Sequence, residues 1–191
     1  MKKEETMSHF SKRVCPVEIA GILDNRIRRW LQNPQKILGH YINEGMTVLD
    51  LGCGPGFFST DIAHMVGKSG HVIASDLQEG MLQKLKGKIQ GTEVEERITL
   101  HKCEETRIGI SENVDFVLAF YMIHEVPNQD KFLNEVGSIL KTNGQFLIVE
   151  PTFRVSKTAF EETIAKAIST GFTIVERPEL FLSKAVVLKK N

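Results

Sequence analysis

The feature that most constrains the fold is a regular alternation of short apolar runs with amphipathic stretches after Gly45. Seven runs have the length and composition of buried β-strands: Thr47–Leu51, His71–Ser75, Ile98–Lys102, Val114–Phe120, Gln145–Glu150, Thr173–Glu176 and Ala185–Leu188. Amphipathic stretches with helical spacing separate most of them: Phe57–Val66, Gly80–Lys88, Asp130–Leu140 and Lys157–Thr170. This order predicts a doubly wound α/β fold, in which helices cover both faces of a mostly parallel sheet.

The end of the chain interrupts this alternation. Only about Arg177–Ser183 separates the last two apolar runs, which is too short for a crossover helix. These runs should therefore form an antiparallel hairpin, so that five or six parallel strands are joined by one reversed strand. Gly70, Gly144 and Gly171 precede strands, where glycines that end helices are expected.

Residues 1–44 have a different pattern from the domain expected at residues 45–191. From Val17 to about Tyr41, apolar residues recur near the helical period, and Pro34 marks a break or a new helix start. Topology makes this N-terminal helical segment the main candidate for a lid. Cys15-Pro16 and the helix that carries Trp30 would then lie across the mouth of the site.

Charge and cysteine content exclude several classes of function. The chain has 24 basic and 24 acidic residues, and this balance argues against nucleic acid as a partner. The cysteines at positions 15, 53 and 103 are too widely spaced for a disulfide framework or a metal site. No apolar run approaches the roughly 18 residues of a membrane-spanning helix, and the polar N-terminus lacks a signal peptide's apolar stretch. We therefore expect a cytoplasmic protein without a metal, of undetermined oligomeric state.

A glycine-rich loop, Gly52-Cys53-Gly54-Pro55-Gly56, follows the first expected strand and precedes a helical stretch. Ligands of such sheets bind beyond the carboxyl ends of the strands, where glycines let the ligand approach the backbone. The spacing is GxGxG, and Phe57 stands where the dinucleotide fingerprint GxGxxG requires its third glycine. A GxxxxGK[ST] phosphate loop is absent from the sequence.

Two acidic residues flank this loop. Asp50 stands two residues before the first glycine, where its carboxylate would repel a pyrophosphate but would suit an ammonium or sulfonium group. Asp76 ends the second expected strand, 20 residues beyond Gly56, where it can accept hydrogen bonds from both ribose hydroxyls. Together they predict a site for a nucleoside with a positively charged tail, and they disfavour an NAD-dependent oxidoreductase.

Residues 50–56 and Asp76 resemble the first two motifs of the class I S-adenosylmethionine-dependent methyltransferases. The resemblance extends from about Gly45 to Leu188, and it includes residues 102–105, 119–126 and 144–151. It is closest to the small-molecule enzymes related to the ubiquinone and menaquinone methyltransferases. It implies a Rossmann-like seven-stranded sheet with a C-terminal hairpin, S-adenosylmethionine as the cofactor and S-adenosylhomocysteine as the product.

The resemblance also implies roles for individual residues. Asp50 and the backbone of the glycine loop would hold the methionine part of the cofactor, and Asp76 would bind the ribose. Leu77 and Met81 would enclose the adenine, with Cys103 and Glu104 at its edge, and the backbone of Ala119 would line the floor. The implied cofactor-binding set is Asp50, Gly52, Cys53, Gly54, Gly56, Asp76, Leu77, Met81, Cys103, Glu104 and Ala119. Ordinary packing remains the alternative for Cys53, Met81 and Cys103.

Methyl transfer depends mainly on positioning, and it needs a general base only where the acceptor keeps its proton. His124 is a candidate base or a structural histidine, and Tyr121 contacts the acceptor or shapes the pocket. We expect Glu125 to be structural. The sequence Ala119-Phe120-Tyr121-Met122 differs from the Asn-Pro-Pro-Tyr motif of enzymes that methylate amide or adenine nitrogens. We therefore expect a small-molecule acceptor; the alternative is a non-catalytic S-adenosylmethionine-binding sensor or assembly partner.

Overall fold

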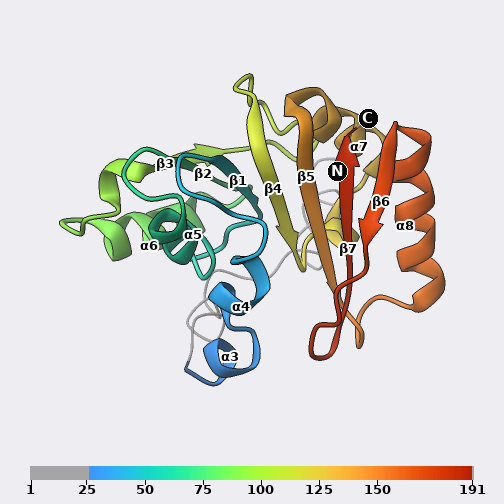
Figure 1. Ribbon diagram of the computed structural model, residues 1–191, viewed down its shortest axis with the longest axis horizontal. Coiled ribbons are helices and arrows are strands. Elements are labelled where there is room, and N and C mark those ends of the chain that lie inside the picture. Colours follow the sequence, from blue (N-terminus) through green and yellow to red (C-terminus); the bar gives the residue numbers. More distant parts are fainter. Residues whose placement is uncertain (1–25, 191) are drawn as a thin grey trace, which may run out of the picture.

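The computed structural model describes residues 26–190, so predictions on residues 1–25, including Cys15-Pro16 and the helical pattern from Val17, lie outside the described residues. A seven-stranded sheet has the strand order β3-β2-β1-β4-β5-β7-β6 (Figure 1). The strands are β1 (Thr47–Leu51), β2 (His71–Asp76), β3 (Ile98–Lys102), β4 (Val114–Phe120), β5 (Leu140–Pro151), β6 (Phe172–Glu176) and β7 (Ser183–Lys190). Seven strands at the expected places confirm the predicted sheet.

The strand directions also agree with the prediction. Strands β1 to β5 pair in parallel, whereas β7 runs antiparallel to both of its neighbours, β5 and β6. One reversed strand therefore lies among six parallel ones, and residues 177–182 form the predicted hairpin connection. In Figure 1, β4 points toward the lower edge of the sheet and β7 toward the upper edge.

The described helices begin with two short ones before the sheet. The α-helices are α3 (Arg26–Leu31), α4 (Pro34–Leu38), α5 (Ser59–Met65), α6 (Glu79–Ile89), α7 (Gln129–Ile139) and α8 (Lys157–Ser169), and the 3₁₀ turns are η2 (Glu95–Arg97) and η3 (Ile123–Glu125). Pro34 starts α4, and the Asn33 side chain caps it by accepting the Lys36 N–H at 3.1 Å. None of the helices within residues 26–190 is long and apolar enough to cross a membrane.

The two faces of the sheet form separate hydrophobic clusters, because successive strand residues point to opposite sides. Val48 and Leu118 belong to the cluster covered by α4, α5 and α6. Their neighbours Leu49 and Val117 belong to the cluster covered by α7 and α8. Helices thus cover both faces of the sheet, as the alternation of elements predicts.

Of the three glycines predicted to end helices, only Gly171 does so; Gly70 and Gly144 do not. Gly171 follows α8 with φ +99°, as expected, but after α5 the left-handed residue is Gly67, at φ +66°, because this helix already ends at Met65. Gly144 lies within β5, which begins at Leu140 and shifts register before Gln145. The left-handed residue in this bulged part of β5 is Asn143, at φ 66°.

Candidate functional site

The carboxyl ends of β1, β2 and β4 meet at one edge of the sheet. The chain order reverses here, because β1 lies between β2 and β4, and such a switch point opens a crevice for ligands. A cavity of about 750 Å³ lies at this edge, lined by the loops that follow these strands. Leu31, the last residue of α3, and Gln32, which follows it, also line the cavity, as do Phe181 and Leu182 in the β6–β7 hairpin. In Figure 1 these segments lie along the lower edge of the sheet.

The three glycines of the loop after β1 have different surroundings, although all have positive φ angles: Gly52 +67°, Gly54 +55° and Gly56 +80°. Apart from Gly54 itself and its two chain neighbours, no described residue has an atom within 4 Å of a Cβ built on Gly54, which lines the cavity. A Cβ on Gly52 would stand 3.0 Å from Met122. A Cβ on Gly56 would stand only 2.3 Å from Leu85 of α6, and Gly56 does not line the cavity. Gly54 is thus open to a ligand, whereas Gly56 permits close packing of α6.

Backbone N–H groups hold the Asp76 carboxylate at the cavity wall. Its Oδ2 accepts the Gly54 N–H at 2.9 Å, and its Oδ1 accepts the Gln78 N–H at 2.8 Å. Burial raises the pKa of Asp76, and these N–H groups act in the opposite direction. The glycine loop and the end of β2 therefore fix the orientation of this carboxylate.

The second acid, Asp50, lies deeper but also lines the cavity. It is 2% exposed, and its Oδ2 accepts the Ser59 hydroxyl at 2.6 Å. Burial, together with the charges of Asp50 and Asp76, raises the pKa of the Cys53 thiol well above its usual value, so Cys53 stays protonated. Two carboxylates and an open glycine in one cavity fit a ligand with a cationic group and hydroxyl groups.

The other predicted cofactor residues divide into two groups. Leu77, Met81, Cys103 and Glu104 line the same cavity as the glycine loop. Burial raises the pKa of the Cys103 thiol, and the Cys103 N–H donates to the Asp76 carbonyl at 3.1 Å. Ala119 is fully buried in the cluster beneath α7 and α8, and it does not line the cavity. Apart from Gly56 and Ala119, the structure brings all the predicted cofactor residues together: Asp50, Gly52, Cys53, Gly54, Asp76, Leu77, Met81, Cys103 and Glu104.

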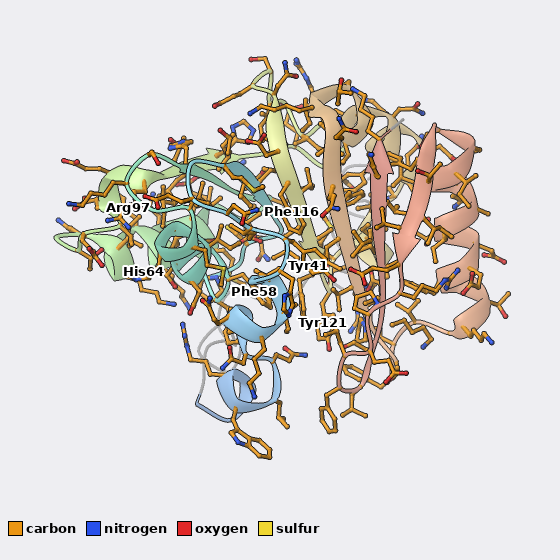
Figure 2. The ribbon with its side chains drawn as sticks, viewed as in Figure 1. Tyr41, Phe58, His64, Arg97, Phe116 and Tyr121 are labelled. Atoms are coloured by element: carbon orange, nitrogen blue, oxygen red, sulfur yellow. The ribbon has the colours of Figure 1, made fainter. Side chains whose placement is uncertain are left out.

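Tyr121 lines the cavity and joins three segments of the chain. Its hydroxyl oxygen lies 2.6 Å from Gln32 Nε2, which donates to it, and 2.6 Å from Ser183 Oγ. Its φ of 62° is unusual for a residue with a side chain and costs on the order of 1–3 kcal/mol. Figure 2 shows Tyr121 and Phe58 near the lower edge of the sheet, and the Phe120 ring contacts both of theirs at centroid distances of 4.4–4.5 Å.

His124 and Glu125 are adjacent residues of the turn η3 that line different cavities. His124 does not line the main cavity but a second one of about 540 Å³, together with Glu150 and Arg154. Its Nδ1 lies 2.6 Å from Glu150 Oε2, and its backbone N–H donates to Glu150 Oε1 at 3.0 Å. Glu125, by contrast, lines the main cavity.

The Glu125 carboxyl group has an unusual environment. Its side chain is 21% exposed, and its Oε1 lies 3.9 Å from His124 Nε2. Burial raises the pKa of Glu125 to about 7, with contributions from the negative charges of Glu150 and Asp76, against the positive charges of His124 and Arg154. At neutral pH this group can therefore either accept or donate a proton.

Sequence reasoning missed the apolar part of the cavity. Phe120, Phe153, Phe181 and Leu182 line it, and the last three are 57–79% exposed. These residues come from the end of β4, the β5–α8 loop and the hairpin, which only the folded chain brings together. Their spacing in the sequence carries no periodic signal that could have identified them.

Comparisons with known proteins agree with this geometry. Residues 42–180 match a family described as "Methyltransferase domain". The fold superposes on a SAM dependent methyltransferase from Aquifex aeolicus with a TM-score of 0.82 and 27% identity, over 93% of this chain and 100% of that one.

Two curated relatives match part of the chain. It is 31% identical over 124 residues to demethylmenaquinone methyltransferase of Lactobacillus johnsonii, covering 63% of this chain and 51% of that protein. It is 28% identical over 110 residues to the ubiquinone/menaquinone biosynthesis C-methyltransferase of Haemophilus ducreyi, covering 57% and 42%. The matched part of the chain thus spans about half the length of these relatives.

Proposed function

Since the chain belongs to the class I S-adenosylmethionine-dependent methyltransferases, we propose that it transfers the methyl group to a small apolar acceptor bound in the same cavity. The observation that carries this proposal is the mixed lining of one cavity of about 750 Å³. Acidic residues and glycines line this cavity together with aromatic side chains. This volume lies within the range of small-molecule sites and can accept a nucleoside together with a small second ligand.

The acidic part of the cavity suits the cofactor. Asp76 would accept hydrogen bonds from the ribose hydroxyls, and the open Cα of Gly54 would let the methionine part approach the backbone. The negative charge of Asp50 would attract the methionine ammonium group. When bound, S-adenosylmethionine supplies an electrophilic methyl carbon, and the carbon–sulfur electron pair goes to the sulfur as the new bond forms.

The adenine would lie further along the same wall. Leu77 and Met81 would enclose its ring, Cys103 would border it, and Glu104 would accept a hydrogen bond from its amino group. Their common position in the cavity lining supports these roles. Gly56 and Ala119 would support the site through packing, since neither lines the cavity.

The aromatic part of the cavity suits an apolar acceptor. Phe120, Tyr121, Phe153 and Phe181 line it, and such rings stabilise a bound ring system by stacking and by burial of apolar surface. The Lactobacillus johnsonii relative acts, by its name, on demethylmenaquinone. Because these aromatic side chains line the same cavity as the glycine loop and the two aspartates, we infer an enzyme rather than a non-catalytic sensor.

The N-terminal segment, residues 1–44, would act as a lid on the domain of residues 45–191. The support for this role is that Leu31 and Gln32 line the cavity and that Gln32 donates a hydrogen bond to Tyr121. A variant that lacks residues 1–33 should bind the acceptor more weakly and turn it over more slowly. Unchanged turnover of the acceptor would contradict the lid.

Two measurements test the proposed function. Calorimetry should detect binding of S-adenosylhomocysteine and S-adenosylmethionine, and failure of both at millimolar concentration would refute the cofactor site. A screen of small molecules with methyl-labelled donor should then identify an acceptor among apolar ring compounds. Binding of the cofactor without transfer to any small molecule would instead favour the sensor.

A further inference from the structure

Glu125 is an acidic side chain of the main cavity that the proposed cofactor roles do not use. Met122, Val126 and Phe132 line the same cavity. Among the residues that the structure describes, the recorded partner of its carboxylate is His124 Nε2 at 3.9 Å, which is beyond hydrogen-bond distance. The carboxylate therefore has capacity to accept a proton or a hydrogen bond from a ligand.

A second carboxylate fixes the orientation of His124 behind Glu125. Glu150 is 2% exposed and contacts both the backbone N–H and the Nδ1 of His124. Because Nδ1 lies 2.6 Å from Glu150 Oε2, the imidazole ring is held with Nε2 on the side of Glu125, 3.9 Å from its Oε1. His124 lines the second cavity and Glu125 lines the main one, so the side chains of His124 and Glu125 lie between the two cavities.

We propose that Glu125 is the catalytic residue that takes the proton of an aromatic hydroxyl acceptor, and that His124 and Glu150 are its positioning residues. This inference rests on the proposed methyl transfer. In the step, the acceptor's O–H bond breaks and its proton moves to a Glu125 oxygen. The electron pair left on the acceptor oxygen forms the bond to the methyl carbon, while the carbon–sulfur bond breaks and its electron pair goes to the sulfur. The sulfonium loses its positive charge and Glu125, on taking the proton, loses its negative charge, so the total charge is unchanged.

The electrostatic surroundings of Glu125 suit this role. Its pKa of about 7 makes it an effective base near neutral pH, because a carboxylate with an ordinary pKa would be a weaker proton acceptor. The charges that act on it come from four residues: His124 in η3, Arg154 in the β5–α8 loop, Glu150 in β5 and Asp76 in β2. A rate that depends on ionised Glu125 should rise with pH through about 7.

The test compares two phenols with different acidity in the full-length protein. At about pH 8, 2-naphthol keeps its proton, whereas 4-nitrophenol is largely ionised without help. Glu125→Gln should slow transfer to 2-naphthol by about 100-fold or more, the usual contribution of a general base. Transfer to 4-nitrophenol should change by much less. Glu161→Gln, on α8 and paired with Arg177, is the matched control and should change neither rate.

Further readouts separate a catalytic role from a structural one. S-adenosylhomocysteine should bind Glu125→Gln as it binds the wild type, and Glu125→Asp should recover part of the rate. The ¹³C NMR signal of the Glu125 carboxyl should titrate near pH 7. His124→Gln should move this titration, and the acidic limb of the pH–rate profile, to higher pH because a neighbouring positive charge is lost.

The unfavourable outcomes are distinguishable. If the wild type fails to bind S-adenosylhomocysteine, the proposed function fails. If it binds S-adenosylhomocysteine but methylates neither phenol, the acceptor chemistry inferred for Glu125 is wrong. If Glu125→Gln methylates 2-naphthol at the wild-type rate with the same pH profile, Glu125 is not the base.

Discussion

Two glycines in the loop after β1 should respond to the same substitution in opposite ways. Gly54→Ala and Gly56→Ala both place a Cβ on a residue with positive φ. The Cβ on Gly54 would project into open space, whereas the Cβ on Gly56 would stand 2.3 Å from Leu85, which is fully buried. Gly54→Ala should therefore impair ligand binding, and Gly56→Ala should impair folding.

The magnitudes follow from backbone strain and packing. A left-handed alanine costs roughly 1–2 kcal/mol, and both variants pay this cost. Gly56→Ala adds an overpacking cost of roughly 1–3 kcal/mol, because the side chain of Leu85, which is fully buried, would have to shift. We expect unfolding free energies lower by about 1–2 kcal/mol for Gly54→Ala and about 2–5 kcal/mol for Gly56→Ala.

Urea unfolding followed by circular dichroism measures this difference. Circular dichroism is preferable to fluorescence because the only tryptophan, Trp30, is 82% exposed and reports poorly on the core. In a Leu85→Ala background the clash is absent, so the penalty for Gly56→Ala should shrink to that of strain alone. Equal destabilisation by the two glycine variants, or an unchanged penalty in that background, would refute the packing role of Gly56.

Ligand affinity, measured on the folded molecules of each variant, also tests the binding site. Calorimetry with S-adenosylhomocysteine should show weaker binding to Gly54→Ala, because the new methyl group occupies cavity space. Gly56→Ala should bind with nearly wild-type affinity wherever it is folded. The reverse pattern would mean that Gly56, and not Gly54, contacts the ligand.

Three further predictions concern other residues of the cavity. Asp76→Ala should weaken S-adenosylhomocysteine binding by about 1.5–3 kcal/mol, which is the scale of hydrogen bonds to a charged group. An unchanged affinity in calorimetry would contradict the ribose-binding role of Asp76. The pKa of Glu125 is raised from 4.5 to about 7, so its contribution to stability is fully present below pH 4.5 and is lost as the pH rises to about 7. Glu125→Gln should therefore gain stability relative to the wild type between about pH 5 and 8 in urea unfolding, and a constant difference would argue against the raised pKa. Tyr121→Phe should lower the unfolding free energy by about 1 kcal/mol, because Gln32 and Ser183 lose the tyrosine hydroxyl as a hydrogen-bond partner. Unchanged urea unfolding would show that these hydrogen bonds add no net stability.

The strands and their directions could be predicted because their signals are local. Ile98–Lys102 and Val114–Phe120 are short apolar runs whose predicted bounds agree with β3 and β4. The short connection after β6 allowed only a hairpin. The predicted C-terminal ends of the four helices in the sheet domain agree with the structure to within one residue, but the glycine after α5 was identified wrongly: Gly67 rather than Gly70 takes the left-handed conformation. Both glycines follow the helix closely, and composition does not distinguish them.

The sequence by itself determined the sheet, the glycine loop and the two acids near it, because each depends on the order of neighbouring residues. The positions of Asp50 and Asp76 could be predicted because each lies at or near the carboxyl end of an apolar run, and both line the cavity. Only the tertiary structure decided which of two adjacent residues in the turn η3 lines that cavity: Glu125 does, whereas His124 lines the second cavity. It also decided the partners of Tyr121, because Gln32 lies 89 residues away in the chain and Ser183 lies 62. Contacts over such separations depend on how whole elements pack, and no local pattern of residues encodes them.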